Sequence, residues 1–182
     1  MQTFISFLGV VVGALGAGFG LYQYRRNQIW RETEFVANQT KEFFADDSVR
    51  KALRILDWEK RFIDLLADKP PVFVTRDMLR EALKHGPDAT KFTHEGAAIR
   101  DVFDTYFTRL EAFEQFIKAG VIEFRQIEPY QRYWAGILAG QRPKILDPET
   151  IKVIWGFLHD YGYNDAMALM KRYHPAPIQF AT

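Results

Sequence analysis

The stretch from Phe4 to Tyr24 reads FISFLGVVVGALGAGFGLYQY and contains 21 consecutive residues without a charged side chain. A helix of that length measures about 32 Å, which matches the hydrocarbon core of a lipid bilayer. Basic residues follow the run and none precedes it, whereas a cleaved signal peptide has a positive N-terminal region. The stretch therefore predicts a transmembrane helix that is retained in the mature protein.

One face of this predicted helix consists of small residues. They follow a 3-4-3-4 spacing and, at about 100° per residue, fall within an arc of roughly 80°; they are Ser6, Gly9, Gly13, Gly16 and Gly20. Membrane helices associate through close backbone packing, which small residues permit. Glycine is also common in membrane helices that have no partner, but two Gly-xxx-Gly motifs in one register favour a helix-packing face. Because the sequence has one such run, the partner is expected to be another polypeptide, either a second copy or a subunit of a larger membrane complex.

Aromatic and basic residues flank the C-terminal end of the apolar run. Tyr22, Tyr24 and Trp30 suit the headgroup zone of a membrane, and Arg25 and Arg26 can extend their guanidinium groups to the lipid surface. The positive-inside rule then places the N-terminus outside and the residues after the run in the cytoplasm. Membrane lipid is thus the first expected partner of the chain.

The rest of the chain has the size and composition of one globular domain. Two of the 24 basic residues precede residue 27, whereas all 23 acidic residues follow it, so residues 27–182 carry a formal charge of −1. This balance argues against a nucleic-acid partner, which requires a basic face. The chain has no cysteine, which excludes disulfides, thiolate metal ligands and a cysteine nucleophile.

Hydrophobic spacing and capping residues predict an all-α fold. A single N-terminal transmembrane helix continues into a stalk through Ala45, because no Gly or Pro occurs between Leu21 and Asp47, and a cytoplasmic helical bundle follows. The expected parts are a transmembrane anchor (1–26), a juxtamembrane stalk helix (27–46), a helical domain (47–174) and a tail (175–182). The bundle helices are expected over 49–67, 76–85, 94–119, 128–139, 148–161 and 164–173.

Local signals mark the ends of these helices. Asp46-Asp47-Ser48, Thr75, Thr93 and Asp147 have the side chains that cap helix N-termini. Gly120 and Gly162 suit the position after a helix C-terminus. Residues 72–74 read as a short strand or linker, and residues 121–124 are the segment with which they could pair.

Histidine and aspartate residues offer an alternative reading in which the domain holds a metal. His159-Asp160 is the dipeptide found in metal-dependent phosphohydrolases, and further ligands would have to come from other helices, with His94, Asp101, Asp104 and Asp165 as candidates. The same dipeptide occurs at ordinary helix ends, where histidine favours the negative end of the helix dipole. The spacing gives no HExxH motif, and no metal or other cofactor is predicted.

Pairs of carboxylates have structural explanations. Asp46 and Asp47 are explained by helix capping, and Asp101 and Asp104 lie on what is expected to be a solvated helix face. Asp57 lies next to apolar residues, so its charge should be paired, with Arg61 or an arginine of another helix as partner. Neither these pairs nor any nucleophile motif predicts a catalytic residue.

Two stretches resemble a known group of proteins. They are Gln23-Tyr-Arg-Arg-Asn-Gln-Ile-Trp-Arg31 and Phe43-Phe-Ala-Asp-Asp-Ser-Val-Arg-Lys-Ala-Leu-Arg-Ile-Leu-Asp57, and the segment from Gly120 to Trp134 follows the same pattern. They are similar to uncharacterised bacterial proteins with an N-terminal single-pass anchor and a small cytoplasmic helical domain. The resemblance implies a bacterial inner-membrane location and supplies no catalytic residue.

Together these features predict a non-enzymatic, membrane-anchored interaction protein or accessory subunit. It would assemble through the small-residue face of its membrane helix. The alternative is a membrane-tethered sensor or metal-dependent hydrolase that uses the His/Asp residues of the helical domain.

Overall fold

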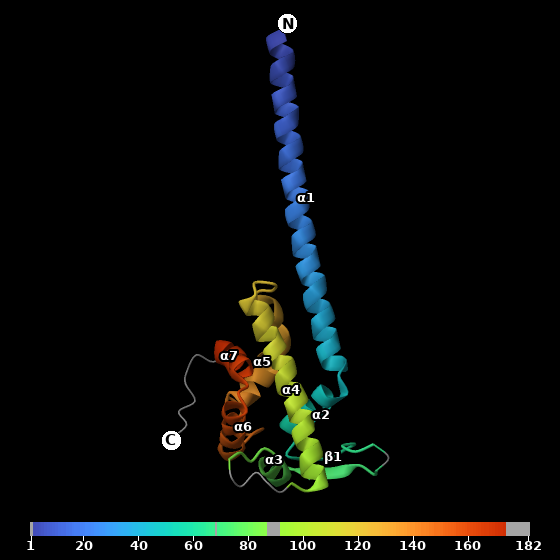
Figure 1. Ribbon diagram of the computed structural model, residues 1–182, viewed down its shortest axis with the longest axis vertical. Helices are drawn as coiled ribbons and strands as arrows, with labels where there is room; N and C mark the ends of the chain where they lie inside the picture. Colours follow the sequence, from blue (N-terminus) through green and yellow to red (C-terminus); the bar gives the residue numbers. More distant parts are fainter. Residues whose placement is uncertain (1, 68, 87–91, 174–182) are drawn as a thin grey trace. The chain divides into compact units, whose positions relative to one another are not determined.

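The computed structural model describes residues 2–67, 69–86 and 92–173, with side chains described from residue 15 onward except that of residue 17. Within these residues the chain forms seven helices and one two-stranded sheet (Figure 1). Their bounds are α1 Gln2–Ala45, α2 Asp47–Asp57, β1 Lys60–Ile63, β2 Val72–Thr75, α3 Arg76–Ala82, α4 His94–Lys118, α5 Phe124–Leu138, α6 Pro148–Asp160 and α7 Asn164–Tyr173. The chain divides into two compact units, Met1–Gln39 and Thr40–Thr182. The mostly helical fold confirms the predicted all-α class of the bundle. The predicted tail lies outside the described residues.

Helix α1 is continuous through the apolar run and the segment that follows it. The absence of Gly and Pro after Leu21 explains this continuity, because no residue there lacks a backbone donor or prefers a left-handed conformation. The predicted continuation to Ala45 is confirmed. In the part of the chain whose side chains the structure describes, no helix combines the length and the apolar character that a bilayer crossing requires.

Side-chain caps begin four of the helices as the sequence predicts. Asp46 accepts hydrogen bonds from the backbone of Ser48 at the start of α2, and Thr93 accepts one from Gly96 at the start of α4. Thr75 caps α3, and Asp147 caps α6 through the backbone of Thr150. Each cap satisfies an amide that the first turn of a helix leaves without an internal partner.

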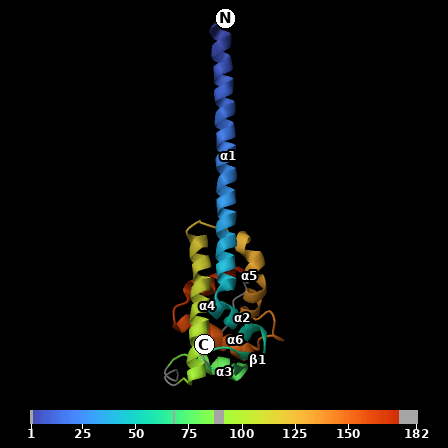
Figure 2. The same cartoon turned by 90° about the vertical axis from the view of Figure 1, so that its right-hand side faces the viewer.

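The core of the unit Thr40–Thr182 is built around α4. Phe103, Tyr106 and Phe107 are fully buried on this helix, and the ring of Phe107 lies 6.1 Å from that of Phe157 in α6. Helices α2 and α7 pack against α4, and α2 also contacts α5. Figure 2 shows α2 beside α4. Between α5 and α6, the indole Nε1 of buried Trp155 donates to the carbonyl of Leu138 at 2.8 Å.

The predicted helix over 49–67 is wrong in its second half. Helix α2 ends at Asp57, Trp58 adopts an extended conformation, and residues 60–63 form β1. Strand β1 pairs antiparallel with β2, so the expected pairing of residues 72–74 with 121–124 is also wrong. The cause is tertiary: the Arg76 guanidinium binds the carbonyl oxygens of Ile55 and Leu56, which satisfies the helix end where the local sequence would allow another turn.

Helix α5 begins four residues earlier than predicted. It starts at Phe124, and the backbone of Glu123 donates to the side-chain oxygen of Gln126 at 2.7 Å. This is one arm of a capping box, which stabilises a helix start ahead of Pro129. Pro129 therefore lies inside the helix and not in its first turn, and residues 121–123 precede the helix instead of forming a strand.

Candidate functional site

The described half of the predicted helix-packing face is open. A Cβ atom added at Gly16 or Gly20 would meet no described heavy atom within 4 Å beyond its chain neighbours and the nearby helix backbone, and the same holds for Gly18. The structure does not describe the surroundings of the other three residues of this face, which are Ser6, Gly9 and Gly13. Gly16 and Gly20 therefore leave room for the backbone of another helix.

Large apolar side chains surround these glycines and are exposed. Leu15, Phe19 and Leu21 expose between 63% and 69% of their surface. The predicted interface anchors Tyr22, Tyr24, Arg25, Arg26 and Trp30 are exposed as well. Exposed apolar surface of this extent calls for a covering by lipid or protein.

The His/Asp residues do not form a metal site. Across the stretches of chain described here, no group of three His, Asp or Glu side chains is arranged to hold a metal ion. Asp104 accepts a hydrogen bond from the Tyr163 hydroxyl at 2.8 Å, and Asp165 instead pairs with Lys118. The alternative reading requires one shared site, and the described residues show none formed by His94, Asp101, Asp104, Asp165 and His159-Asp160.

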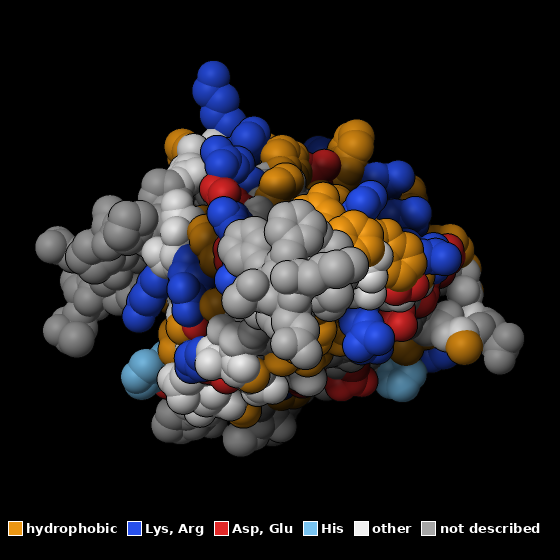
Figure 3. All heavy atoms as spheres, turned by 90° about the horizontal axis from the view of Figure 1, so that it is seen from above, with side chains coloured by type: hydrophobic (Ala, Val, Ile, Leu, Met, Phe, Trp, Pro, Cys, Tyr) orange, Lys and Arg blue, Asp and Glu red, His pale blue; other side chains and the backbone are white. Residues whose placement is uncertain are grey.

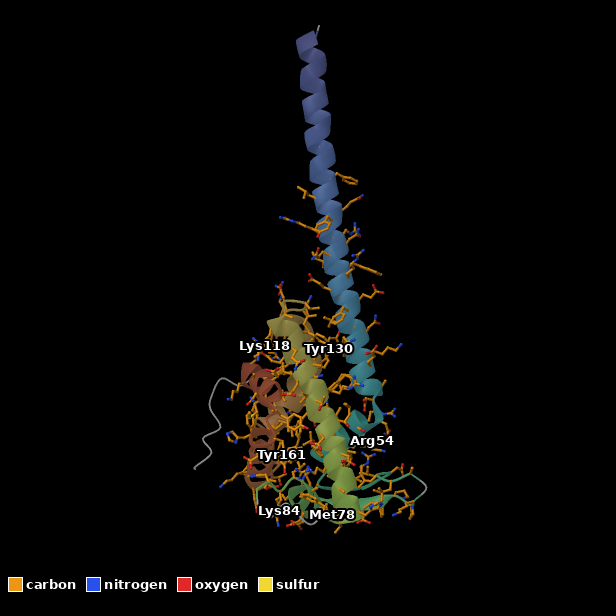
Figure 4. All side chains as sticks on the ribbon, in the orientation of Figure 1. Arg54, Met78, Lys84, Lys118, Tyr130 and Tyr161 are labelled. Carbon is orange, nitrogen blue, oxygen red and sulfur yellow. The ribbon has the colours of Figure 1, made fainter. Side chains whose placement is uncertain are left out.

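Asp160 does bind two imidazoles, one of which the sequence did not single out. His85 Nδ1 lies 2.9 Å from the Asp160 carboxylate, and His159 Nδ1 lies 3.2 Å from it. The hydrogen bond from His159, together with the charge of both rings when protonated, lowers the pKa of Asp160. Gly156 makes room for His85, because a Cβ at Gly156 would lie only 2.1 Å from the His85 Nε2 atom. These contacts join the end of α6 to the segment after α3, near Lys84 in Figure 4.

The predicted partner of Asp57 is also corrected. The half-buried carboxylate accepts a hydrogen bond from the Tyr133 hydroxyl of α5, and this bond raises the pKa of Tyr133. The Arg61 guanidinium instead lies 4.9 Å from the centre of the Trp58 ring. The turn from α2 into β1 places Arg61 on a strand, so the expected helical spacing between Asp57 and Arg61 does not exist. By contrast, Asp46 caps α2 and pairs with Arg109, and Asp47 pairs with Arg50 and Lys51.

A polar cleft of about 420 Å³ lies beside α3 and the segment that leads into α6. Its innermost charge is Arg76, which is 8% exposed and donates hydrogen bonds to the carbonyl oxygens of Ile55, Leu56 and Ile145. Burial lowers the pKa of Arg76. The guanidinium thus joins the end of α2 to the chain that precedes α6.

The other charges of the cleft are engaged with one another. Arg80 donates to the Thr150 hydroxyl at 3.1 Å and pairs with Asp77 and Asp147. Lys60, Lys144 and Glu59 complete the charged lining, so acidic and basic groups nearly balance. On the face drawn in Figure 3, blue basic and red acidic side chains are likewise mixed. The cleft therefore has the chemistry of an ion-pair framework, since its two arginines are already bonded within the fold.

The hairpin carries an exposed pair of aromatic rings that sequence reasoning missed. Phe62 and Phe73 are register partners on β1 and β2, with ring centroids 4.9 Å apart. They expose 66% and 46% of their surface. The only local signal is the β-favouring run at residues 72–75, because residues 60–63 read Lys-Arg-Phe-Ile and do not alternate between apolar and polar. We call these two residues the hairpin aromatic pair.

Comparison with known protein families, with curated proteins and with solved structures returns no match. The resemblance to single-pass bacterial proteins therefore stays a prediction. The surfaces that stand out are the apolar face of α1 and the hairpin aromatic pair, both of which suit binding.

Proposed function

We propose that this protein is a non-enzymatic interaction subunit, anchored in the bacterial inner membrane by the N-terminal half of α1. In this proposal the N-terminus lies outside and the helical unit lies in the cytoplasm. The observation that carries the proposal is the surface of α1, where exposed Leu15, Phe19 and Leu21 accompany the open glycine positions 16 and 20. A lipid environment covers such apolar side chains, and a second helix fits the glycines.

The length of the apolar run also supports this reading. Twenty-one uncharged residues match the thickness of a bilayer, and half of the run, residues 4–14, has side chains outside the described part of the structure. The exposed Tyr22, Tyr24, Arg25 and Arg26 then suit the lipid headgroup zone on the cytoplasmic side. Fractionation of bacterial membranes tests the anchor: the protein should resist extraction by alkaline carbonate, and a version without residues 4–24 should be released.

The helical unit would supply the docking surface. The hairpin aromatic pair supports this role, because two phenylalanine rings on the outer face of a two-stranded sheet offer apolar surface that a partner protein could bury. The metal-hydrolase alternative has no such support, since its residues are engaged in separate contacts across the described stretches.

Substitutions on α1 test the assembly directly. Gly16→Leu and Gly20→Leu should weaken the association of the α1 helix with its partner in a bilayer. The association is measured by chemical crosslinking that does not use cysteine, or by resonance energy transfer between labelled copies of the chain. Gly18→Leu is the matched control, because it adds the same side chain to the same helix but lies roughly 160–200° away from Gly16 and Gly20 around the axis. A Cβ atom at any of the three positions is equally open, with no described atom within 4 Å beyond its chain neighbours and the nearby helix backbone, so a difference between the variants reports on another chain.

The mass of the native particle in mild detergent decides the broader proposal. We expect a particle heavier than the 21.2 kDa chain and its bound lipid, either a multiple of the chain or a complex with other subunits. A monomer without any partner, together with equal association of all three glycine variants, would contradict the proposal.

A further inference from the structure

Three helices of the unit Thr40–Thr182 enclose a small cavity with polar groups in its wall. Tyr106 of α4, Gln131 of α5 and Tyr173 of α7 line it, and the rest of the wall consists of Ala, Leu and Met side chains. Tyr106 is completely buried and Gln131 is 2% exposed. The cavity therefore lies mostly beneath the surface, and side chains with hydrogen-bonding groups line it from three separate helices.

The polar atoms in this wall have no hydrogen-bond partner among the described residues. They are the hydroxyl groups of Tyr106 and Tyr173 and both the amide nitrogen and the amide oxygen of Gln131. A buried polar atom without a partner destabilises the folded state, so four such atoms would be a heavy penalty for a domain of this size. Folded proteins normally satisfy such groups, and the three residues that carry them line the same cavity, which points to a shared ligand.

The size of the cavity identifies the ligand. The space open to the centre of a water-sized sphere is about 10 Å³, which is close to the minimum that holds one water molecule. A larger organic molecule does not fit this space. An ion does not suit it either, because no charged side chain lines the cavity.

The hydrogen-bonding capacity of the wall matches water. The Gln131 nitrogen donates, its oxygen accepts, and each tyrosine hydroxyl can do either. Burial raises the pKa of Tyr106, with the nearby Tyr173 adding to the effect, and burial raises the pKa of Tyr173 as well. Both hydroxyls thus keep their protons at neutral pH and remain available as donors.

We propose that one water molecule is bound between α4, α5 and α7, where it bridges the hydroxyls of Tyr106 and Tyr173 and the side-chain amide of Gln131. The bound water is a structural ligand of the helical unit and does not depend on the proposed membrane function. It joins three helices through side chains that have no hydrogen-bond partner among the described residues. Water bound in this way exchanges slowly with solvent and contributes to the stability of α7.

The direction in which the melting temperature changes tests the proposal. Removing a hydroxyl that binds the water should lower the melting temperature of the full chain, and we expect Tyr106→Phe and Tyr173→Phe each to lower it by about 3–5 °C. Removing a hydroxyl from a dry cavity would instead raise the melting temperature, because an unsatisfied buried group disappears. Tyr130→Phe is the matched control, since Tyr130 of α5 is 49% exposed and should show no change (Figure 4).

Nuclear magnetic resonance detects the water itself. In the native protein we expect nuclear Overhauser effects between a long-lived water and the ring protons of Tyr106, and we expect Gln131→Leu to abolish them. This measurement on the native chain remains decisive if a variant fails to fold. The proposal is overturned if no long-lived water contacts Tyr106, or if Tyr106→Phe raises the melting temperature.

Discussion

The ion pair between Glu114 and Arg172 gives the most direct test of the energetics of the helical unit. The side chain of Glu114 in α4 is 2% exposed, and its two carboxylate oxygens accept hydrogen bonds from Arg172 Nε at 2.7 Å and from a terminal guanidinium nitrogen at 2.8 Å. Replacing Arg172 by methionine keeps most of the side-chain volume but removes both bonds. The carboxylate of Glu114 would then be buried with a charge and without its partner.

The magnitude follows from the burial of the two groups. Removing one partner of a fully buried pair costs about 3–5 kcal/mol of unfolding free energy. Arg172 is 38% exposed on the native protein, so water can enter when its guanidinium is removed, and we expect the lower end, about 3 kcal/mol. For a unit of this size that corresponds to a melting temperature lower by about 10 °C.

The assay is thermal unfolding of the full chain followed by near-ultraviolet circular dichroism. Buried Trp155 reports on the core of the unit, whereas helical signal from α1 contributes little in this spectral region. Lys171→Met is the matched control, because Lys171 is the exposed neighbour of Arg172 on α7. The control should melt within about 1–2 °C of the native protein.

A double substitution separates pairing from packing. Glu114→Leu combined with Arg172→Met removes both charges and should recover much of the loss, since no uncompensated charge stays buried. The reasoning is refuted if Arg172→Met melts with the native protein, or if the double variant is less stable than Arg172→Met.

Three further predictions concern the helix ends. Arg76→Met removes three hydrogen bonds to carbonyl oxygens and should lower the unfolding free energy, measured in urea, by about 3 kcal/mol. The control is Arg54→Met at an exposed position (Figure 4), which should leave the unfolding free energy unchanged. Equal urea midpoints for the two variants would contradict the role of Arg76. Partial burial raises the pKa of Asp147, but hydrogen bonds from Thr150 and the charge of Arg80 outweigh it, so the folded pKa lies below the unfolded value. The resulting stability is present above about pH 4 and is lost as the pH falls further, and Asp147→Asn should remove this part of the acid transition in a pH series of melting curves. Gly120 has φ of +68° after α4, so Gly120→Ala should cost about 1 kcal/mol in the same urea assay, and a neutral result would show that this turn adapts freely.

Helix starts were predicted correctly from the sequence where the deciding interaction lies within one turn of the helix. Asp46, Thr75, Thr93 and Asp147 cap helices in the structure because an N-cap side chain needs only the next three residues to act. The same holds for the absence of Gly and Pro that keeps α1 continuous. The helical class of the fold was therefore predictable from short stretches read independently.

The hairpin was not predictable in this way. Residues 58–67 continue an apolar helical pattern, and the end of α2 is set by a guanidinium that lies 20 residues further along the chain. The hydroxyl of Tyr133 that binds Asp57 comes from 76 residues away. Contacts of such separation depend on the packing of whole helices, which periodicity does not encode. The hairpin aromatic pair and the water cavity, which follow from such packing, were missed for the same reason.

The three carbonyl acceptors of Arg76 are synthesised at different times. Its last acceptor, the carbonyl of Ile145, lies 69 residues downstream, and a ribosome adding about 5–20 residues per second needs roughly 3–14 s to make that stretch. Until then, only two of the three native acceptors of Arg76, the carbonyls of Ile55 and Leu56, have been synthesised. A chain that ended before residue 145 would lack the third acceptor.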